Sequence, residues 1–252
     1  MRNTSPAWRD FDWSLPVSLR DLSLALLFSV NALLSAGVEA QSLSTLDVDL
    51  FRSINNAQSP KSGLLDIVDV SSGPLFVIVP VVLVSSGIIG QNPEWTRAGA
   101  LIGASQLLAG GSAVLLKMVT GRPRPFEALE NVNLKHRSSA TGSAFPSGHT
   151  ALAFALATSA SLCLENPYVS LPVFVWAGMV GYGRIYLGLH YPSDIVGGIV
   201  IGVASAWFVW QYRDEIGSFV ERNLSIRQAE YDHSTSIPGL STELIRLQIR
   251  LR

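Results

Sequence analysis

The stretch VSSGPLFVIVPVVLVSSGIIGQNP, Val70 to Pro93, carries no charged side chain and decides the class of fold. An α-helix needs about 20 mostly apolar residues to cross the hydrocarbon core of a bilayer, and this stretch is long enough. Comparable charge-free runs recur along the chain. They lie between Asp21 and Glu39, Arg97 and Lys117, His149 and Glu165, Glu165 and Arg184, and Asp194 and Arg213. The sequence therefore predicts an all-α, polytopic membrane protein whose six transmembrane helices form a bundle.

The overall composition agrees with a membrane protein. Only 15% of the 252 residues are charged and the mean hydropathy is +0.33, whereas about a quarter of the residues of a soluble domain are charged. The formal net charge of −1 gives no reason to expect a nucleic acid partner. The single cysteine, Cys163, excludes an internal disulfide and a cysteine metal cluster.

The pattern divides the chain into an N-terminal segment (1–19), a six-helix membrane domain (20–212) and a polar C-terminal tail (213–252). The second helix is expected from about Pro74 to Gly90. Between the first two helices, residues 39–72 predict a short amphipathic element on the membrane surface. That element combines apolar residues at near-helical spacing with four aspartates: Leu46, Leu50, Phe51 and Ile54, with Asp47, Asp49, Asp66 and Asp69.

The first charge-free run, residues 21–38, has two interpretations. Basic residues precede it, and the sequence VEA at Val38 to Ala40 resembles the cleavage site of a signal peptide. We favour a retained helix, because the rest of the chain is an integral membrane protein that needs such an anchor.

Polar and charged residues gather at helix ends in three motifs. These are KMVTGRPRP (Lys117–Pro125), PSGH (Pro146–His149) and GRIYLGLHYPSD (Gly183–Asp194). The first follows the third helix and the second precedes the fourth, so both lie on one membrane face. The chain crosses away on the fourth helix and returns on the fifth, which places the third motif on the same face. Charged groups are costly at membrane depth, so this convergence indicates a functional site.

The residue types of the three motifs favour a phosphate site. Arg124 and Arg184 offer planar donor forks that suit phosphate oxygens, and Lys117 adds a compact charge. If Ser147 caps the fourth helix, the backbone N–H groups from Gly148 onward form an anion cradle at the helix N-terminus. The glycine also allows close approach of a ligand.

Two histidines and one carboxylate complete the expected chemistry. Asp194 follows His190 by four residues and, by accepting a hydrogen bond, would fix its tautomer and raise its basicity. The free ring nitrogen of His190 could then attack phosphorus as a covalent nucleophile. His149 would protonate the leaving oxygen and later activate water. Taken singly, each of these residues has an ordinary explanation as a cap, a dipole partner or an interfacial anchor. Their shared face and spacing favour the site.

Other polar residues of the loops have no place in this pattern. His136 and His233 are interpreted as loop residues. Arg122, Lys135 and Arg137 have two open interpretations: they attract anionic head groups, or they are solvated loop charges.

The three motifs resemble the signature of the type-2 phosphatidic acid phosphatase superfamily. That family contains lipid phosphate phosphatases, bacterial undecaprenyl pyrophosphate phosphatases and, more distantly, soluble vanadium haloperoxidases. The motifs span Lys117 to Asp194, and the six-helix pattern extends the resemblance to about residues 20–212. The tail lies outside it.

The resemblance implies a metal-free and cofactor-free hydrolysis. It implies phosphate-binding roles for five residues: Lys117, Arg124 and Arg184, assisted by Ser147 and Gly148. It further implies that His190 forms a phosphohistidine, with Asp194 as its partner and His149 as the acid. One position departs from the family, because the third motif usually has Ser where this chain has Gly183. Glycine keeps the small size but lacks the hydroxyl, so we expect a modest effect on rate or packing.

These observations predict a membrane phosphatase that acts on a lipid phosphate or lipid pyrophosphate of the undecaprenyl pyrophosphate, phosphatidic acid or phosphatidylglycerol phosphate type. Phosphotransfer to an alcohol at the same site is the nearest alternative. A haloperoxidase is disfavoured by six membrane spans. A non-catalytic lipid-binding or transport protein is disfavoured because His149, His190 and Asp194 are all present. The sequence carries no signal for the oligomeric state.

The charge distribution also predicts an orientation in the cell (inner) membrane. The segments on the side away from the site are rich in arginine: Arg2, Arg9, Arg20, Arg97, Arg213, Arg222 and Arg227. The positive-inside rule makes that side cytoplasmic, which places both termini in the cytoplasm and the site on the external or periplasmic face. The site face carries many cations as well, which its function alone would explain.

Overall fold

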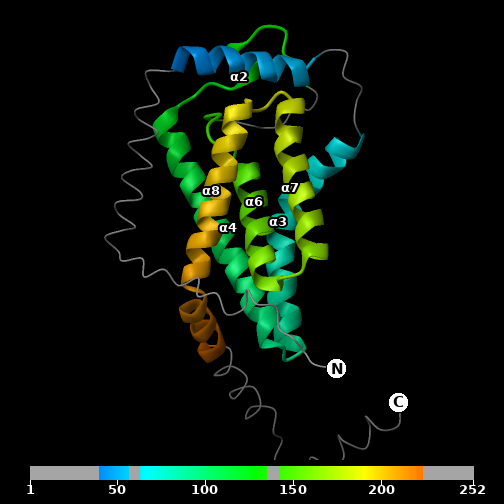
Figure 1. Ribbon diagram of the computed structural model, residues 1–252, viewed down its shortest axis with the longest axis vertical. Helices are drawn as coiled ribbons and strands as arrows, with labels where there is room; N and C mark the ends of the chain where they lie inside the picture. Colours follow the sequence, from blue (N-terminus) through cyan, green and yellow to red (C-terminus); the bar gives the residue numbers. More distant parts are fainter. Residues whose placement is uncertain (1–39, 57–62, 135–141, 224–252) are drawn as a thin grey trace, which may run out of the picture.

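The computed structural model describes residues 40–56, 63–134 and 142–223 (Figure 1), and within these ranges every regular element is a helix. The helices are α2 (Ala40–Ile54), α3 (Gly63–Ile89), α4 (Pro93–Thr120), α5 (Pro125–Ala128), α6 (Gly148–Leu164), α7 (Pro167–Tyr186) and α8 (Pro192–Gln211). Residues 213–223 are also helical. The expected first span, residues 21–38, lies outside the described ranges. The prediction of an all-α fold is confirmed.

Helix α3 begins at Gly63, well before Pro74, where the sequence analysis placed its start. That boundary was wrong because Asp66 and Asp69 were assigned to the surface element. Asp66 lies in the first turn of α3, where a negative charge is favourable beside the partial positive charge of the helix N-terminus. Pro74 and Pro80 both lie inside the helix.

The ends of α4 are set by local hydrogen bonds. The side chain of Asn92 accepts from the backbone N–H groups of Glu94 and Trp95 and so caps the start of the helix. At the other end Gly121 adopts a left-handed conformation with φ of 56°, and its N–H donates to the Lys117 carbonyl oxygen. Lys117 therefore lies in the last turn of α4, at the end of the bundle.

Large apolar side chains cover the outside of the bundle. Many are more than half exposed, among them Ile89, Leu107, Val119, Leu171 and Val196. Such a surface suits lipid rather than water. By length and composition, three of the described helices can cross a membrane, namely Gly63–Ile89, Pro93–Ala128 and Pro192–Gln211. Helix α6 is apolar but has only 17 residues; it corresponds to the short charge-free run between His149 and Glu165. The chain is a helical membrane protein.

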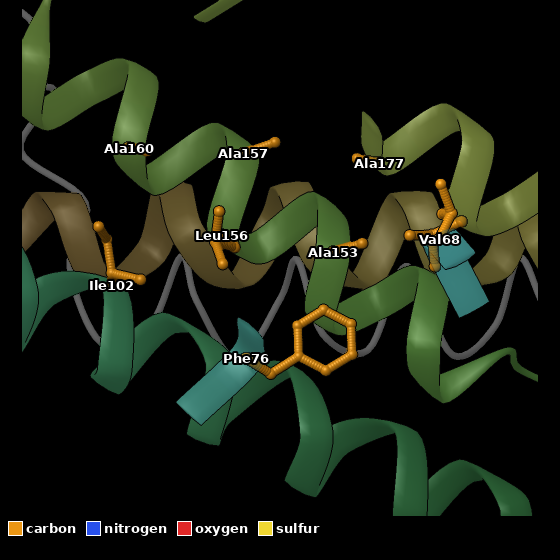
Figure 2. Close-up of a cluster of buried hydrophobic side chains, with 9 residues drawn as sticks. Val68, Phe76, Ile102, Ala153, Leu156, Ala157, Ala160 and Ala177 are labelled. Atoms are coloured by element: carbon orange, nitrogen blue, oxygen red, sulfur yellow. The ribbon is translucent and has the colours of Figure 1, made fainter. Parts of the chain in front are cut away.

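The interior between α3, α4, α6 and α7 is packed with small and medium side chains (Figure 2). Phe76 of α3 and Ile102 of α4 pack against Ala153, Leu156 and Ala157 of α6. Small residues let helix backbones approach closely, which is the usual basis of helix association in membranes. Helix α6 thus forms the centre of the bundle.

Helix α8 lies against α6 at Gly198 and Gly202, whose GxxxG spacing predicts close packing. A Cβ atom on Gly198 would lie 2.7 Å from the carbonyl oxygen of Ser147, and one on Gly202 would collide with the carbonyl oxygen of Ala151. The backbone N–H of Ser147 donates to the carbonyl oxygen of Asp194 at 2.9 Å. The first turns of α6 and α8 are therefore locked side by side.

Helix α2 lies across the end of the bundle at which α4 and α7 finish and α6 and α8 begin (Figure 1). The apolar residues that predicted this amphipathic element do not share one environment. Phe51 is buried beneath the helix, whereas Leu46 and Leu50 are 56% and 46% exposed. The inward face pairs Phe51 with buried Asp47, four residues earlier, because it meets polar groups at the start of α8.

Candidate active site

The three sequence motifs lie together at the end of the bundle covered by α2. The first follows the end of α4, the second forms the start of α6, and the third joins α7 to α8. Their charged side chains interact electrostatically: Lys117, Arg124, Arg184 and His190 all act on His149. The structure thus brings the cations, the histidines and the carboxylate of the sequence analysis into one cluster.

His190 and Asp194 form the buried centre of this cluster. The Nδ1 atom of His190 lies 3.4 Å from Oδ2 of Asp194, which also accepts a hydrogen bond from the Tyr191 backbone N–H at 2.8 Å. His190 is 4% exposed and Asp194 is fully buried. The proline at the first position of α8, Pro192, sets the helix start that separates the two by one turn.

The environment of His190 keeps its imidazole neutral. Burial lowers the pKa of His190 to about 4, and the positive charges of Arg124 and Lys117 act in the same direction. The hydrogen bond and charge of Asp194 oppose this shift without cancelling it. With Nδ1 directed at Asp194, the lone pair of a neutral ring lies on Nε2, which is 3.4 Å from Nη1 of Arg124.

Two of the cations are held by backbone carbonyl groups. Arg124 is 6% exposed, and it donates from Nε to the Gly142 carbonyl oxygen at 3.0 Å and from Nη1 to the Leu189 carbonyl oxygen at 3.3 Å. Lys117 donates from Nζ to the Ser143 carbonyl oxygen at 2.6 Å. Neutral acceptors orient both side chains, so these hydrogen bonds do not themselves neutralise the positive charges.

Arg184 differs because it has a carboxylate partner. It is 6% exposed at the end of α7 and forms an ion pair with Asp69 of α3. Its Nε atom is buried and has no hydrogen-bond partner among the described residues. A buried donor without a partner costs free energy, so an incoming anion would gain a ready contact. The sequence analysis missed Asp69, because it assigned that residue to the surface element.

The start of α6 presents the second motif. Ser147 occupies the N-cap position, but its side chain makes no capping bond and instead accepts from the Thr150 hydroxyl at 2.9 Å. Ser147 is fully buried, and its hydroxyl oxygen accepts from Thr150 rather than from the helix backbone. A Cβ atom on Gly148 would meet no protein atom within 4 Å, so the space beside it is open. His149 lies in the first turn, its ring 6.0 Å from that of Phe76.

A second set of residues is linked to Oδ1 of Asp194, the oxygen that does not face His190. Arg122 donates from Nη1 to Oδ1 of Asp194 at 2.8 Å and from Nη2 to Oδ2 of Asp47 at 2.6 Å. Neither open interpretation of Arg122, as a head-group attractor or as a solvated charge, described this pairing. One sequence feature could have identified Asp47 as a buried residue. It lies four residues before Phe51, one helical turn away, which puts its carboxylate on the buried face of α2. Lys135 and Arg137, like His136 and His233, lie outside the described residues.

Clustered cations and histidines at one end of a helical membrane bundle are the arrangement expected of a membrane phosphatase. The sequence pattern of the PAP2 superfamily matches residues 98–218, a range that contains all three motifs. Undecaprenyl-diphosphatase BcrC of Bacillus subtilis is 24% identical over 196 residues, which is 77% of this chain and 97% of that protein. Bacitracin transport permease protein BcrC of Bacillus licheniformis is 30% identical over 191 residues, or 73% of this chain and 89% of that protein.

A solved structure supports the same assignment. LpxE of Aquifex aeolicus matches with a TM-score of 0.55 at 32% identity, covering 66% of this chain and 96% of that one. The chain belongs to the PAP2 superfamily, and its family resemblance is confirmed. It is a membrane-embedded phosphatase.

Proposed function

We propose that this chain hydrolyses the terminal phosphate of a lipid phosphate or lipid pyrophosphate through a phosphohistidine on His190. The observation that carries the proposal is the buried cluster of Lys117, Arg124 and Arg184 around two histidines. Three cations at one end of a charge-poor bundle favour an anionic ligand. The buried Nε of Arg184 lacks a hydrogen-bond acceptor among the described residues, although Asp69 pairs with its Nη2 atom. A tetrahedral phosphate with several oxygens suits all three side chains.

The first half of the reaction transfers phosphorus to the protein. Nε2 of His190 attacks the phosphorus atom while the bond to the leaving oxygen breaks, and the Nδ1 proton stays hydrogen-bonded to Asp194. His149 donates its proton to the leaving oxygen. The cations stabilise the charge that builds on the equatorial oxygens. The Ser147 hydroxyl and the Gly148 N–H at the helix N-terminus add donors.

The second half releases inorganic phosphate. His149, now neutral, accepts a proton from water as the water oxygen attacks phosphorus. The P–N bond breaks, which restores neutral His190, and phosphate leaves. An alcohol in place of water would give phosphotransfer by the same steps, so the nature of the acceptor separates these two outcomes.

The substrate class follows from the membrane setting and from the relatives. The apolar exterior of the bundle suits lipid tails, and the site lies at its end. Undecaprenyl-diphosphatase BcrC acts, by its name, on a lipid pyrophosphate. A lipid pyrophosphate is therefore our first candidate, ahead of phosphatidic acid and phosphatidylglycerol phosphate.

The full membrane arrangement is part of the proposal. Residues 21–38 would supply a sixth span within a membrane domain of residues 20–212, flanked by segments 1–19 and 213–252. The site would face the outside or the periplasm, with both termini in the cytoplasm. A cysteine introduced at Ser138, in a chain with Cys163 replaced by Ser, should react with an impermeant reagent in intact cells. Labelling that requires permeabilised membranes would reverse the orientation.

The function is tested by phosphate release from the purified, detergent-solubilised protein in excess EDTA. The substrates are undecaprenyl pyrophosphate, phosphatidic acid, phosphatidylglycerol phosphate and diacylglycerol pyrophosphate, with His190→Ala as the control. We expect release that survives EDTA and vanishes in the variant. No release from any lipid, or equal release by the variant, would overturn the proposal.

A further inference from the structure

The fully buried carboxylate of Asp194 has a counter-ion, Arg122, to which the sequence analysis assigned no catalytic or phosphate-binding role. Its two oxygens have separate partners: Oδ2 faces His190 and the Tyr191 N–H, and Oδ1 accepts from Nη1 of Arg122 at 2.8 Å. Lys117 and Arg124 act on Asp194 only at longer range. Burying a carboxylate is costly unless it is paired and hydrogen-bonded. Among the described residues, Arg122 is the arginine that makes this direct pair.

The guanidinium of Arg122 is itself fixed in place. Nη1 also donates to the Ser193 hydroxyl at 2.6 Å, and Nη2 donates to Oδ2 of Asp47 at 2.6 Å. The Cζ atom lies 4.2 Å from the centroid of the Tyr191 ring, a distance typical of a cation–π contact. The planar fork of an arginine is needed to reach both carboxylates at once.

Asp47 connects this arrangement to α2. Its Oδ1 accepts from the Ser193 backbone N–H at 2.8 Å and its Oδ2 from the Ser193 hydroxyl at 2.6 Å. Tyr191, at the N-cap position of α8, provides no side-chain cap. Asp47 therefore caps α8 from another helix. Because the first turn of α8 separates His190 from Asp194, this cap holds the segment that sets their geometry.

We propose that Asp47 and Arg122 are positioning residues that hold Asp194 toward His190. Formation of the phosphohistidine then depends on the contacts that α2 makes with the start of α8 through Asp47. This inference rests on the proposed function and extends it to two residues that are not among the expected catalytic and phosphate-binding residues. Arg122 acts through Asp194, and Asp47 acts through Arg122 and Ser193. Neither touches the reacting atoms.

The test compares variants of the full-length protein in detergent micelles with undecaprenyl pyrophosphate, or with phosphatidic acid if that is the better substrate. Arg122→Gln removes the charge, Arg122→Lys keeps the charge without the fork, and Asp47→Asn weakens the link to α2. Matched controls on the exposed face of α2 are Asp49→Asn and Arg52→Gln. The readouts are kcat, KM, the single-turnover rate of phosphoenzyme formation, and the melting temperature.

We expect Arg122→Gln to lower kcat and the rate of phosphoenzyme formation by about ten- to a hundredfold. A loss of this size is typical when a residue that orients a functional side chain is removed. KM should change less than about threefold, because the contact is to Asp194 and not to substrate. Arg122→Lys should recover part of kcat, and Asp47→Asn should lower it by about five- to tenfold. The two controls should match the wild type.

Three results would overturn the inference. One is a kcat within twofold of wild type in both Arg122→Gln and Asp47→Asn. Another is a raised KM with unchanged kcat, which would make Arg122 a head-group contact. The third is a lowered melting temperature with unchanged kinetics, which would make the network structural. If Arg122→Gln fails to fold, Arg122→Lys and Asp47→Asn decide the matter by the same criteria.

The control variant His190→Ala separates this inference from the proposed function. If His190→Ala retains phosphate release, the proposed function fails whatever Arg122 does. If His190→Ala is inactive while Arg122→Gln and Asp47→Asn are fully active, only the positioning inference fails.

Discussion

Replacing Gly198 by Ala tests whether the contact between α6 and α8 sets the geometry of the site. The new Cβ atom would lie 2.7 Å from the Ser147 carbonyl oxygen and 2.9 Å from Cβ of Thr150. Ordinary contacts of a Cβ atom begin near 3.4 Å, so the two helices must separate by about 0.7 Å at this point. The obstacle is backbone, which cannot move aside as a flexible side chain would.

Both stability and activity should fall. Overpacking a closely packed interface costs about 1–3 kcal/mol, so the melting temperature should drop. Ser147 and Asp194 share a backbone hydrogen bond across the same contact, so a shift here displaces the phosphate cradle relative to the His190 partner. A misplacement of about 1 Å can cost about a hundredfold in rate. We expect kcat to fall by about tenfold or more.

The assay is phosphate release and thermal unfolding of the purified protein, with Gly178→Ala as the control. A Cβ atom on Gly178, an exposed position of α7, would meet no atom within 4 Å, so that variant should behave as wild type. A Gly198→Ala protein with wild-type kcat and melting temperature would refute the reasoning that the contact of α6 with α8 positions the site.

Three further predictions address the charges and the family departure. Because attack requires a neutral imidazole and burial lowers the pKa of His190 to about 4, the acid limb of kcat/KM, corrected for substrate ionisation, should fall through about pH 4. An acid limb centred near 6.5 would contradict this. Asp69→Asn removes the charge that pairs with buried Arg184 and should lower kcat/KM by about tenfold and also lower the melting temperature. Asp66→Asn, in the first turn of α3, should leave kcat/KM unchanged. Steady-state kinetics and thermal melts test both expectations. Gly183→Ser should fold and stay within about threefold of wild-type kcat, because a Cβ atom there meets nothing within 4 Å; an unfolded variant would contradict the space inferred.

Much of the fold was predictable because lipid imposes strong rules on sequence. A charge-free run in a charge-poor chain has to be buried in lipid or protein, so the helices from Pro93 to Gln211 were found close to their true ends. The start of α3 was missed because Asp66 and Asp69 obscured it. A carboxylate in a first helical turn is compatible with a helix and does not mark its end.

The catalytic motifs were predictable because each one has a local spacing. Lys117 and Arg124 share one motif, and His190 and Asp194 share one helical turn, so counting membrane crossings was enough to bring them together. Asp69 and Asp47 could not be found in this way. Each forms a contact across a large gap in sequence, to Arg184 and to Ser193, and no local pattern encodes such a pair.

The central claim is the covalent step at His190, and trapping the intermediate tests it most directly. The purified protein is mixed with a lipid phosphate that carries a radioactive terminal phosphate, quenched in alkali within one turnover, and analysed for protein-bound label. We expect label that is stable in alkali and labile in acid, as a phosphoramidate is, and that is absent from His190→Ala. Phosphate release with no bound label at any time, or label that persists in His190→Ala, would contradict it.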